Sequence, residues 1–297
     1  MSQVFVNSKK ISLSAVERSA GYWATVWQRF LQDRLAVGAA VVILFLFILV
    51  LFGPWLAPAD PYAASMLKRL KPIGFEGHLL GTDELGRDML SRLMVGTRLS
   101  LFIGITPVAF AFFVGSFIGI VGGYYGGALN AILMRTIDVF YAFPSVLLAI
   151  ALSGALGAGI TNSLISLTVV FIPPIARVAE SVTTQIRSRD FVDAARASGA
   201  NAFTIIRVHV LANVLGPIFV YATSLISVSM ILASGLSFLG LGVKPPEPEW
   251  GLMLNTLSTA IYVQPWVAAL PGLMIFITSI TFNLFSDGFR NAMEVKN

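Results

Sequence analysis

The most constraining feature of the chain is a run of apolar residues, 35–52, that contains no charged side chain. A helix needs roughly 20 apolar residues to cross a bilayer, and lipid admits only helices and closed barrels as spanning structures. The run is longer than the apolar core of a signal peptide, about 7 to 15 residues, and a polar segment precedes it. We therefore expect an uncleaved membrane helix.

Five further segments have a composition that fits membrane helices. The chain is 56% hydrophobic and 12% charged, whereas about a quarter of the residues in a soluble domain are charged. One segment is short and holds Pro173 and Pro174, so a bend or an early end of the helix is expected there. The fold class is predicted to be all-α and integral to the membrane. The six predicted transmembrane helices are 35–52, 99–121, 131–153, 163–177, 213–240 and 265–286.

The segment before the first span has the pattern of an amphipathic helix. Its apolar positions at helical spacing are Tyr22, Trp23, Val26, Trp27 and Phe30. Tryptophan favours the headgroup region, so we expect an interfacial helix that anchors the first span. A gating or partner-binding role stays open.

The basic residues indicate how the chain lies in the membrane. Lysine and arginine are more frequent in the segments that face the cytoplasm when both termini lie there, which favours that orientation. The net charge of +5 is spread among loops, so nucleic-acid binding is not expected. The predicted parts are a cytoplasmic tail with the interfacial helix (1–34), the first transmembrane helix with an extracytoplasmic segment (35–96), a five-helix core (97–286) and a cytoplasmic C-terminus (287–297).

A polar segment, 187–213, interrupts the apolar pattern on the predicted cytoplasmic side. It contains a stretch of good helix formers in which Ala194 and Ala195 leave the surface almost without side chains, so a partner's backbone can approach closely. Gly199 stands where a left-handed C-terminal cap is expected, and Asn201 can cap a second helix. The segment is therefore predicted to be a short helix-turn-helix that meets a soluble partner.

The order of residues in this segment resembles the "EAA" loop of permease subunits in ATP-binding cassette (ABC) importers. The matching positions are Asp193-Ala194-Ala195, Gly199, Ile205-Ile206, His209, Leu211 and Asn213. The nearest match is the dipeptide, oligopeptide and nickel permease family. Its other signatures recur in order as GTDELGRD at 81–88, SR at 91–92, GTRLSL at 96–101, GYYGG at 123–127, MR at 134–135, AFP at 142–144, SFLGLG at 237–242, PP at 245–246, WG at 250–251, NL at 283–284 and DG at 287–288. Two positions depart from the family pattern: Asp193 replaces the usual Glu and Ala212 the usual Pro.

The resemblance implies a type I ABC importer permease fold in the bacterial inner membrane. It also implies a heterodimer with a homologous permease, two ABC ATPase subunits that bind ATP and Mg²⁺, and an extracytoplasmic substrate-binding protein. The loop that couples to the ATPase would comprise Asp190, Asp193, Ala194, Ala195, Gly199, His209 and Leu211. Alternatively, His209 caps a helix or packs within the loop and does not contact the ATPase. Peptides are the expected substrates, with nickel chelates, glutathione or opine-like solutes as alternatives.

Several chemistries are excluded by what the sequence lacks. No G-x-x-x-x-G-K-[ST] motif occurs, so the chain is expected to be no enzyme and to depend on partners for ATP hydrolysis. With no cysteine and only two histidines, no metal site is expected, and no catalytic or cofactor-binding set is found. A function of another class, ion-coupled secondary transport, would require ionisable residues near mid-membrane, and the predicted spans are nearly free of them.

Two charged residues stand near the inner end of the third predicted span. Arg135 and Asp138 are three positions apart and are expected either to form a structural ion pair or to belong to a gate. Pro144 follows and can kink the helix.

The outer segment 81–98 is rich in charge. Asp83 with Arg87 and Asp88 with Arg92 have the i,i+4 spacing of ion pairs on a helix face. A structural outer helix, or a contact for a binding protein, is therefore favoured over catalysis.

Two further patterns bear on packing. Prolines at 245, 246 and 248 exclude a regular helix before the last span, so an outer loop or re-entrant element is expected. Trp250 is expected to anchor it at the membrane interface, with contact to a substrate-delivering protein as the alternative. Close helix packing is favoured over turning for Gly115, Gly119, Gly122, Gly123, Gly126 and Gly127.

Overall fold

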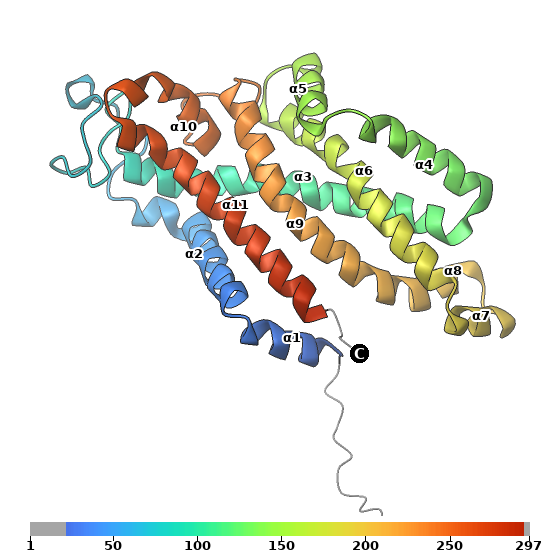
Figure 1. Cartoon of the computed structure of the whole chain (residues 1–297). Helices are drawn as coiled ribbons and strands as arrows, with labels where there is room; N and C mark the ends of the chain where they lie inside the picture. The colour runs from blue at the N-terminus through green and yellow to red at the C-terminus, as the bar shows by residue number, and fades with distance from the viewer. Residues whose placement is uncertain (1–21, 294–297) are drawn as a thin grey trace, which may run out of the picture.

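The computed structural model describes residues 22–293, with side chains from Ala24 onward, as an all-helical structure (Figure 1). Residues 1–21, which include most of the predicted cytoplasmic tail, and residues 294–297 lie outside the described part. The α-helices are α1 (Tyr22–Gln32), α2 (Arg34–Leu56), α3 (Met89–Tyr125), α4 (Gly127–Tyr141), α5 (Ser145–Leu156), α6 (Ile160–Arg187), α7 (Asp190–Ala197), α8 (Ala202–Thr204), α9 (Leu211–Phe238), α10 (Trp250–Thr256) and α11 (Pro265–Met293). Shorter turns are η1 (Met66–Lys68), η2 (Ile205–Val210) and η3 (Ser258–Tyr262).

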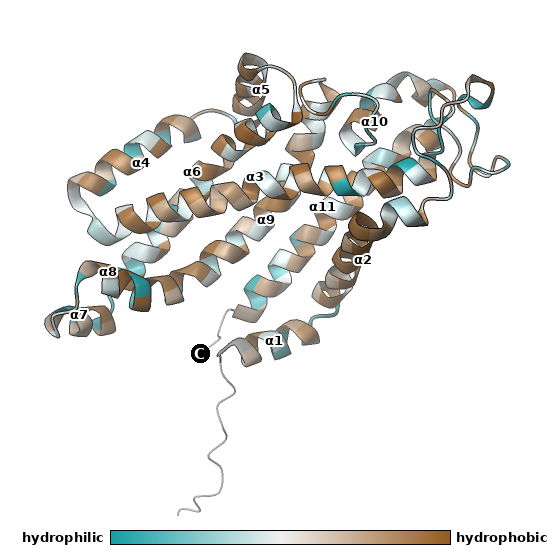
Figure 2. Ribbon diagram, turned by 180° about the vertical axis from the view of Figure 1, so that it is seen from behind, coloured by the Kyte–Doolittle hydropathy of each residue, from teal (hydrophilic) through white to brown (hydrophobic). Residues whose placement is uncertain are grey.

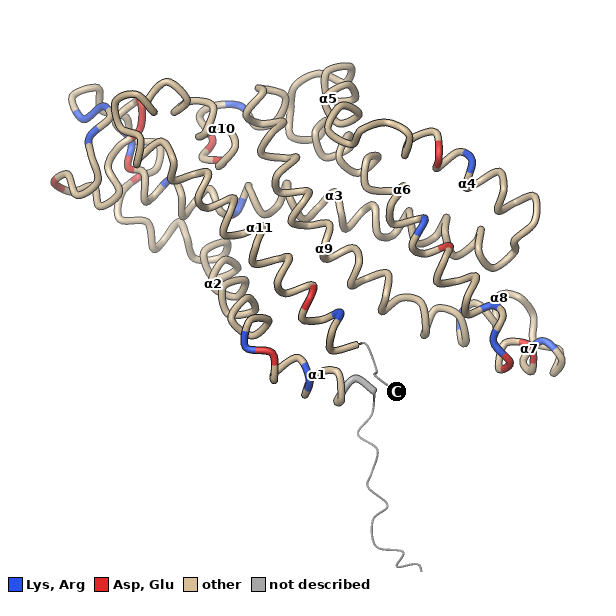
Figure 3. Tube along the Cα trace, in the orientation of Figure 1, with Lys and Arg blue, Asp and Glu red and all other residues tan. Residues whose placement is uncertain are grey.

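The described part contains five helices long and apolar enough to cross a membrane, or six if the bent pair of α4 and α5 is one span. The five are α2, α3, α6, α11 and the unit Ala202–Phe238 that joins α8 to α9. Figure 2 shows α2 as hydrophobic along its whole length, and Figure 3 shows no charge between its ends. The prediction of an all-α membrane fold is confirmed.

The third predicted span is not one helix. α4 ends at Tyr141, α5 begins at Ser145, and the two helices meet at 86°. Pro144 has no amide hydrogen for the helix ladder, and its ring disfavours helical backbone at Phe143. The proline breaks the helix instead of kinking it.

Of the two outcomes expected at Pro173 and Pro174, a bend or an early end of the helix, the early end is wrong. α6 continues through both prolines and runs through polar residues to Arg187. Pro173 is buried, and α6 packs along α3 over this region. The packing offsets the backbone hydrogen bonds that the prolines cannot make.

Glycines allow α3 and α6 to form the most extensive helix–helix contact in the described structure. Gly115, Gly119 and Gly123 stand four residues apart and face the α6 backbone. A Cβ added at Gly119 would lie 2.4 Å from the carbonyl oxygen of Ala176. The packing role predicted for these three glycines is confirmed, whereas Gly126, with φ +66°, forms the turn between α3 and α4.

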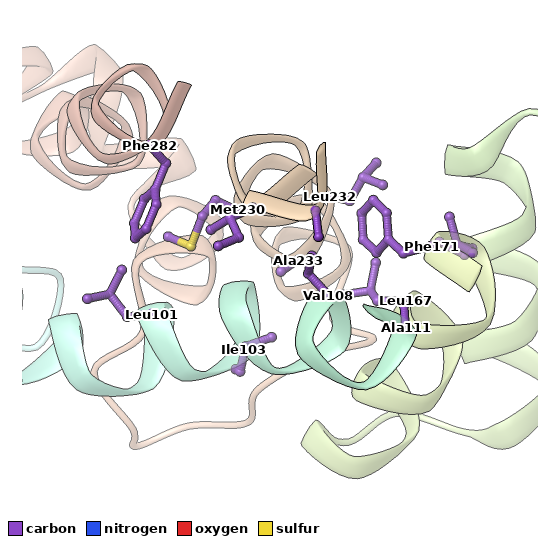
Figure 4. Close-up of a cluster of buried hydrophobic side chains, with 14 of the residues drawn as sticks. Leu101, Ile103, Val108, Ala111, Leu167, Phe171, Met230, Leu232, Ala233 and Phe282 are labelled. Atoms are coloured by element: carbon purple, nitrogen blue, oxygen red, sulfur yellow. The ribbon is translucent and has the colours of Figure 1, made fainter. Parts of the chain in front are cut away.

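The rest of the core lies between α3, α6, α9 and α11. Figure 4 shows side chains of these helices meeting there, with Leu167 and Phe171 of α6 beside Ala111 of α3 and with Met230 of α9 toward Phe282 of α11. The α7–α8 loop lies at one end of the bundle, while α10 and the segment 57–88 lie at the other (Figure 1). The two candidate interaction regions of the sequence are therefore on opposite ends.

α1 is the amphipathic helix expected before the first span. Val26 and Phe30 are buried, and the Phe30 ring lies 5.5 Å from Phe285 and 5.3 Å from Phe289 of α11. Trp27 is 54% exposed, so it can still contact the headgroup region. α1 thus packs on α11 and leaves one face for the membrane.

The outer segment before α3 is not the predicted helix. Gly81 and Gly86 have φ of +77° and +75°, which a right-handed helix excludes. The chain turns there, and α3 begins only after its N-cap, Asp88.

The ion pairs of this segment differ in part from the prediction. Asp83 accepts a hydrogen bond from Arg87 at 2.6 Å, as expected, and also faces Arg92 at 3.2 Å. Asp88 contacts His78 at 3.0 Å instead of Arg92. These groups are buried, and a buried carboxylate needs such partners because its desolvation is costly.

Trp250 is fully buried, so its predicted place at the membrane interface is wrong. Its indole Nε1 donates to the Leu93 carbonyl at 3.1 Å, and its amide donates to the Ser100 hydroxyl at 3.0 Å. Glu249, in the loop before α10, accepts hydrogen bonds from the first amides of that helix. Burial raises the pKa of the Glu249 carboxyl by disfavouring its charged form, and those hydrogen bonds oppose the shift.

Candidate functional site

The polar segment between α6 and α9 forms the surface predicted to meet a soluble partner. α7 places Asp190 and Asp193 in its first turn, where carboxylates favourably meet the positive end of the helix dipole. Val192 is fully buried in a cluster that also holds Ile205 and Val210. This burial fixes α7 against the helix that follows it.

Gly199 ends α7 in the conformation expected from the sequence. Its φ is +83°, its amide donates to the Arg196 carbonyl at 3.1 Å, and the Ala200 amide donates to the Ala195 carbonyl at 3.1 Å. This is the hydrogen-bond pattern of a Schellman cap. A Cβ at Gly199 would meet nothing within 4 Å, so this surface of the cap is open.

The second helix begins at Asn201, whose side chain accepts a hydrogen bond from the Thr204 amide at 2.8 Å, as predicted. It does not end within the polar segment, because α8 and the π-helical turn η2 lead without interruption into α9. Ala212, which departs from the family's proline, lies in this continuous helix. An alanine keeps the backbone amide that a proline would remove.

The predicted coupling residues divide into two groups by exposure. The exposed ones are Asp190, Asp193, Ala194 and Gly199. The half-buried ones are Ala195, His209 and Leu211. The ring of His209 lies 6.3 Å from that of Phe191, which is the packing arrangement left open for it. The half-buried group therefore positions the loop, and the exposed group faces outward.

Phe203 is a surface residue that the sequence interpretation missed. Its side chain is 71% exposed on α8, and Phe191 on α7 is 43% exposed. Phe203 also lines an apolar groove with residues of α3, α9 and α11. Exposed aromatic residues are typical of interaction surfaces. The signal was present in the sequence, since Phe203 follows the Asn201 cap within the first turn, where a solvated helix would carry a polar residue.

A second candidate site lies near the break between α4 and α5. Asp138 forms an ion pair with Arg177 of α6 and not with Arg135. Arg135 is exposed and makes no ion pair with another described residue. α6 lies against α4 and brings Arg177 to a half-buried position next to Asp138. An ion pair there is stronger than one between Asp138 and Arg135 on an exposed helix face would be.

Another polar contact joins the same two helices. Glu180 of α6 accepts a hydrogen bond from Asn130 of α4 at 3.0 Å. Sequence reasoning missed Glu180 because it ended the fourth span at residue 177 and so placed Glu180 outside the membrane.

A cavity of about 320 Å³ lies at the α4–α5 break. Tyr141, Ser145, Phe171 and Tyr221 are among its lining residues and come from α4, α5, α6 and α9. Aromatic faces with hydroxyl groups can contact a small polar solute. Within the described residues, no group of three or more metal-ligating side chains is close enough to hold a metal ion.

Comparisons with known proteins agree with this architecture. A family model for binding-protein-dependent transport system inner membrane components matches residues 113–296, and one for the N-terminal TM domain of oligopeptide transport permease C matches residues 21–72. The chain is 39% identical over 274 residues to the glutathione transport system permease protein GsiD of Pectobacterium atrosepticum, covering 92% of this chain and 91% of that protein. It is 39% identical over 278 residues to GsiD of Escherichia coli O6:K15:H31, covering 92% and 90%.

Solved structures of ABC transporters share the fold at lower sequence identity. The MetNI methionine ABC transporter in an inward-facing conformation aligns with a TM-score of 0.57 and 18% identity, over 69% of this chain and 97% of that one. An amino acid ABC transporter crystallised with histidines aligns with a TM-score of 0.52 and 14% identity, over 67% and 93%. The type I importer permease fold expected from the sequence is confirmed.

The chain belongs to the family of binding-protein-dependent transport system inner membrane components. It is a multi-pass inner membrane permease subunit of an ABC importer of the peptide permease type, and in such systems separate ATPase subunits hydrolyse ATP. The family resemblance noted in the sequence is confirmed, and it decides against the ion-coupled carrier.

Proposed function

We propose that this chain forms half of the translocation path of a peptide importer, and that its α7–α8 loop docks in a groove of an ATPase subunit. Nucleotide-driven closure of two ATPases then rocks the helices between inward-open and outward-open states. The observation that carries this proposal is the exposed α7 surface with its open Gly199 cap, held at one end of the bundle (Figure 1).

The shape of this surface suits docking. Ala194 and Gly199 are exposed and small, so a groove can close over the backbone of α7. Phe203 offers a large apolar contact, and such aromatic anchors contribute much of the binding energy of interfaces. Val192 holds the loop to the helices that must move.

The proposed orientation has the α7–α8 loop and both termini in the cytoplasm. It is supported by the arrangement of the helices, because α1 and the end of α11 lie at the same end of the bundle as α7 (Figure 1). The lysines and arginines expected at this end of the bundle also support a cytoplasmic location, because cytoplasmic segments carry an excess of basic residues. The proposed complex contains a homologous second permease, two ATPases that bind ATP and Mg²⁺, and an extracytoplasmic binding protein.

The proposed substrate is a small peptide. The relatives named above are glutathione permeases, and glutathione is itself a tripeptide. Glutathione is therefore the first solute to test, with dipeptides next and nickel chelates or opine-like solutes as the remaining family alternatives.

The seam between α4 and α6 is the proposed gate. Asp138 and Arg177 stand within one helical turn of Tyr141 and Pro174, which line the cavity at the α4–α5 break. Arg135 is the unpaired cation on α4 among the described charges. A rearrangement of α4 against α6 would break this pair while it opens or closes the cavity.

The coupling proposal is tested with Gly199→Arg in cells that express the complete transporter. Because a Cβ added at Gly199 has no atom of this chain within 4 Å, an arginine there should extend outward, collide with a docked ATPase and reduce uptake of labelled glutathione or dipeptide to background. Membrane insertion should be unchanged.

Gly199→Asn is the matched control. Asparagine tolerates the left-handed backbone that other residues adopt at a cost of about 1–2 kcal/mol, and it is much shorter than arginine. We expect most of the uptake to remain. Normal uptake by Gly199→Arg would contradict the proposal.

A further inference from the structure

A groove on the side of the bundle between α2 and α3 has no part in the coupling site or the gate. Its volume is about 660 Å³, within the range of about 300 to 1,000 Å³ typical of small-molecule sites. The floor is apolar and includes Phe47 and Val50 of α2 and Leu99 and Phe102 of α3. Such a surface on a membrane protein suits a hydrocarbon chain.

The groove has a polar mouth with charges of both signs. Arg98, Glu247 and the Tyr62 hydroxyl line it. The Tyr62 hydroxyl donates to Glu247 at 3.0 Å, which holds the carboxylate in place. Arg98 is exposed and makes no hydrogen bond or ion pair within the part of the chain that the structure describes, Glu247 included.

Aromatic residues at the end of α2 indicate that the mouth lies at the level of the lipid headgroups. Trp55 is 79% exposed and packs against Phe52 at the end of α2, as expected for an aromatic residue at the membrane surface. Gly53 abuts the Met94 carbonyl of α3, so the ends of the two helices are in register there. Arg98 follows Met94 by about one turn, and an arginine at that depth reaches up to a phosphate.

We propose that this groove binds a glycerophospholipid with an ethanolamine headgroup. Arg98 binds the phosphate, Glu247 binds the ammonium group, and one acyl chain fills the apolar floor between α2 and α3. Two separated and opposite charges over an apolar groove match the zwitterionic headgroup and tail of such a lipid. The site is in the leaflet opposite the α7–α8 loop and does not depend on the proposed transport substrate.

The test is native mass spectrometry of the full-length protein, with whatever subunits co-purify, after delipidation and addition of phosphatidylethanolamine or phosphatidylglycerol at equal concentration. Wild type should retain more phosphatidylethanolamine. Arg98→Gln should weaken its retention about tenfold or more, the effect of removing a charge-assisted hydrogen bond. Glu247→Gln should remove the preference between the two lipids.

Two further variants keep the test decisive. Val50→Trp fills the groove without altering charge and should also lose the lipid. Arg69→Gln, which removes an exposed arginine that does not line the groove, should retain it. Unchanged retention in both Arg98→Gln and Val50→Trp, or an equal loss in Arg69→Gln, would overturn the proposal.

A protein covering this face is the competing occupant. The chain has no cysteine, so Phe102→Cys introduces a single thiol at the groove. The lipid proposal expects this thiol to react with a membrane-soluble maleimide in native membranes. A cross-link between the thiol of Phe102→Cys and another polypeptide would overturn the lipid proposal.

Discussion

Gly119 gives a sharp test of the α3–α6 contact because the structure leaves no room there for a methyl group. A Cβ at this position would lie 2.4 Å from the Ala176 oxygen and 2.5 Å from the Ala179 Cβ, whereas ordinary contacts begin at 3.4 Å. The change Gly119→Ala must therefore separate the helices locally by about 1 Å, which a close-packed interior resists. The change strains the most extensive helix–helix contact among the described residues.

The expected cost follows from overpacking by one carbon, which destabilises by about 1–3 kcal/mol. Alanine also favours helix over glycine by up to about 1 kcal/mol, which acts in the opposite direction. Gly38→Ala is the matched control, because Gly38 of α2 has no atom within 4 Å of an added Cβ. Both variants gain the same helix propensity, so the difference between their free energies of unfolding is the cost of overpacking. That cost corresponds to about a fivefold to hundredfold change in the folded-to-unfolded ratio.

The measurement is thermal unfolding of the purified transporter, followed by loss of the monodisperse peak in size-exclusion chromatography. Gly119→Ala should have a lower midpoint than Gly38→Ala, and its uptake should fall with the loss of folded protein. Equal midpoints would refute the packing account of α3 and α6.

Three other predictions concern the proposed gate, the outer end of the bundle and the proposed coupling loop. In a double-mutant cycle, Asp138→Asn and Arg177→Gln should be non-additive in stability by up to about 1 kcal/mol, a modest value because the pair is half-exposed; additive effects would show that the two residues are uncoupled. Burial raises the pKa of Glu249 above its ordinary 4.5, so the folded protein binds more protons and stability should fall as pH rises from about 4.5 through the raised pKa. Thermal midpoints at pH 5 and pH 7.5 should show this slope in wild type and not in Glu249→Gln. Phe203→Ala should reduce co-purification of the ATPase about tenfold, whereas Phe110→Ala, which truncates a 60% exposed phenylalanine in the membrane helix α3, should not.

Sequence reasoning found the helices whose apolar runs are continuous. The run at 35–52 lies within α2, and the segment 265–286 lies within α11, because lipid requires a helix wherever enough apolar residues follow one another. It failed at prolines, where the outcome depends on packing: Pro144 breaks a helix, while Pro173 stays inside one against α3. Local propensity does not contain that information.

The conformation of the α7–α8 loop was predictable because its signals are local. A Schellman cap at Gly199 and an N-cap at Asn201 depend on residues within one turn. The partners of Asp138 and Asp88 were not predictable, since Arg177 and His78 reach them through tertiary packing and loop turns. The i,i+3 and i,i+4 spacing of residues predicts only contacts within the same helix.

The central claim, that α7 docks on an ATPase, is tested most directly by cross-linking in native membranes. The chain has no cysteine, so Ala194→Cys places a single thiol on the exposed face of α7, and Leu67→Cys places one on the 91% exposed Leu67 site at the opposite end. With a short thiol cross-linker, the account predicts that Ala194→Cys is joined to a P-loop ATPase subunit and that Leu67→Cys is not. An ATPase joined through Leu67→Cys, or none joined through Ala194→Cys in a complex that still transports, would contradict it.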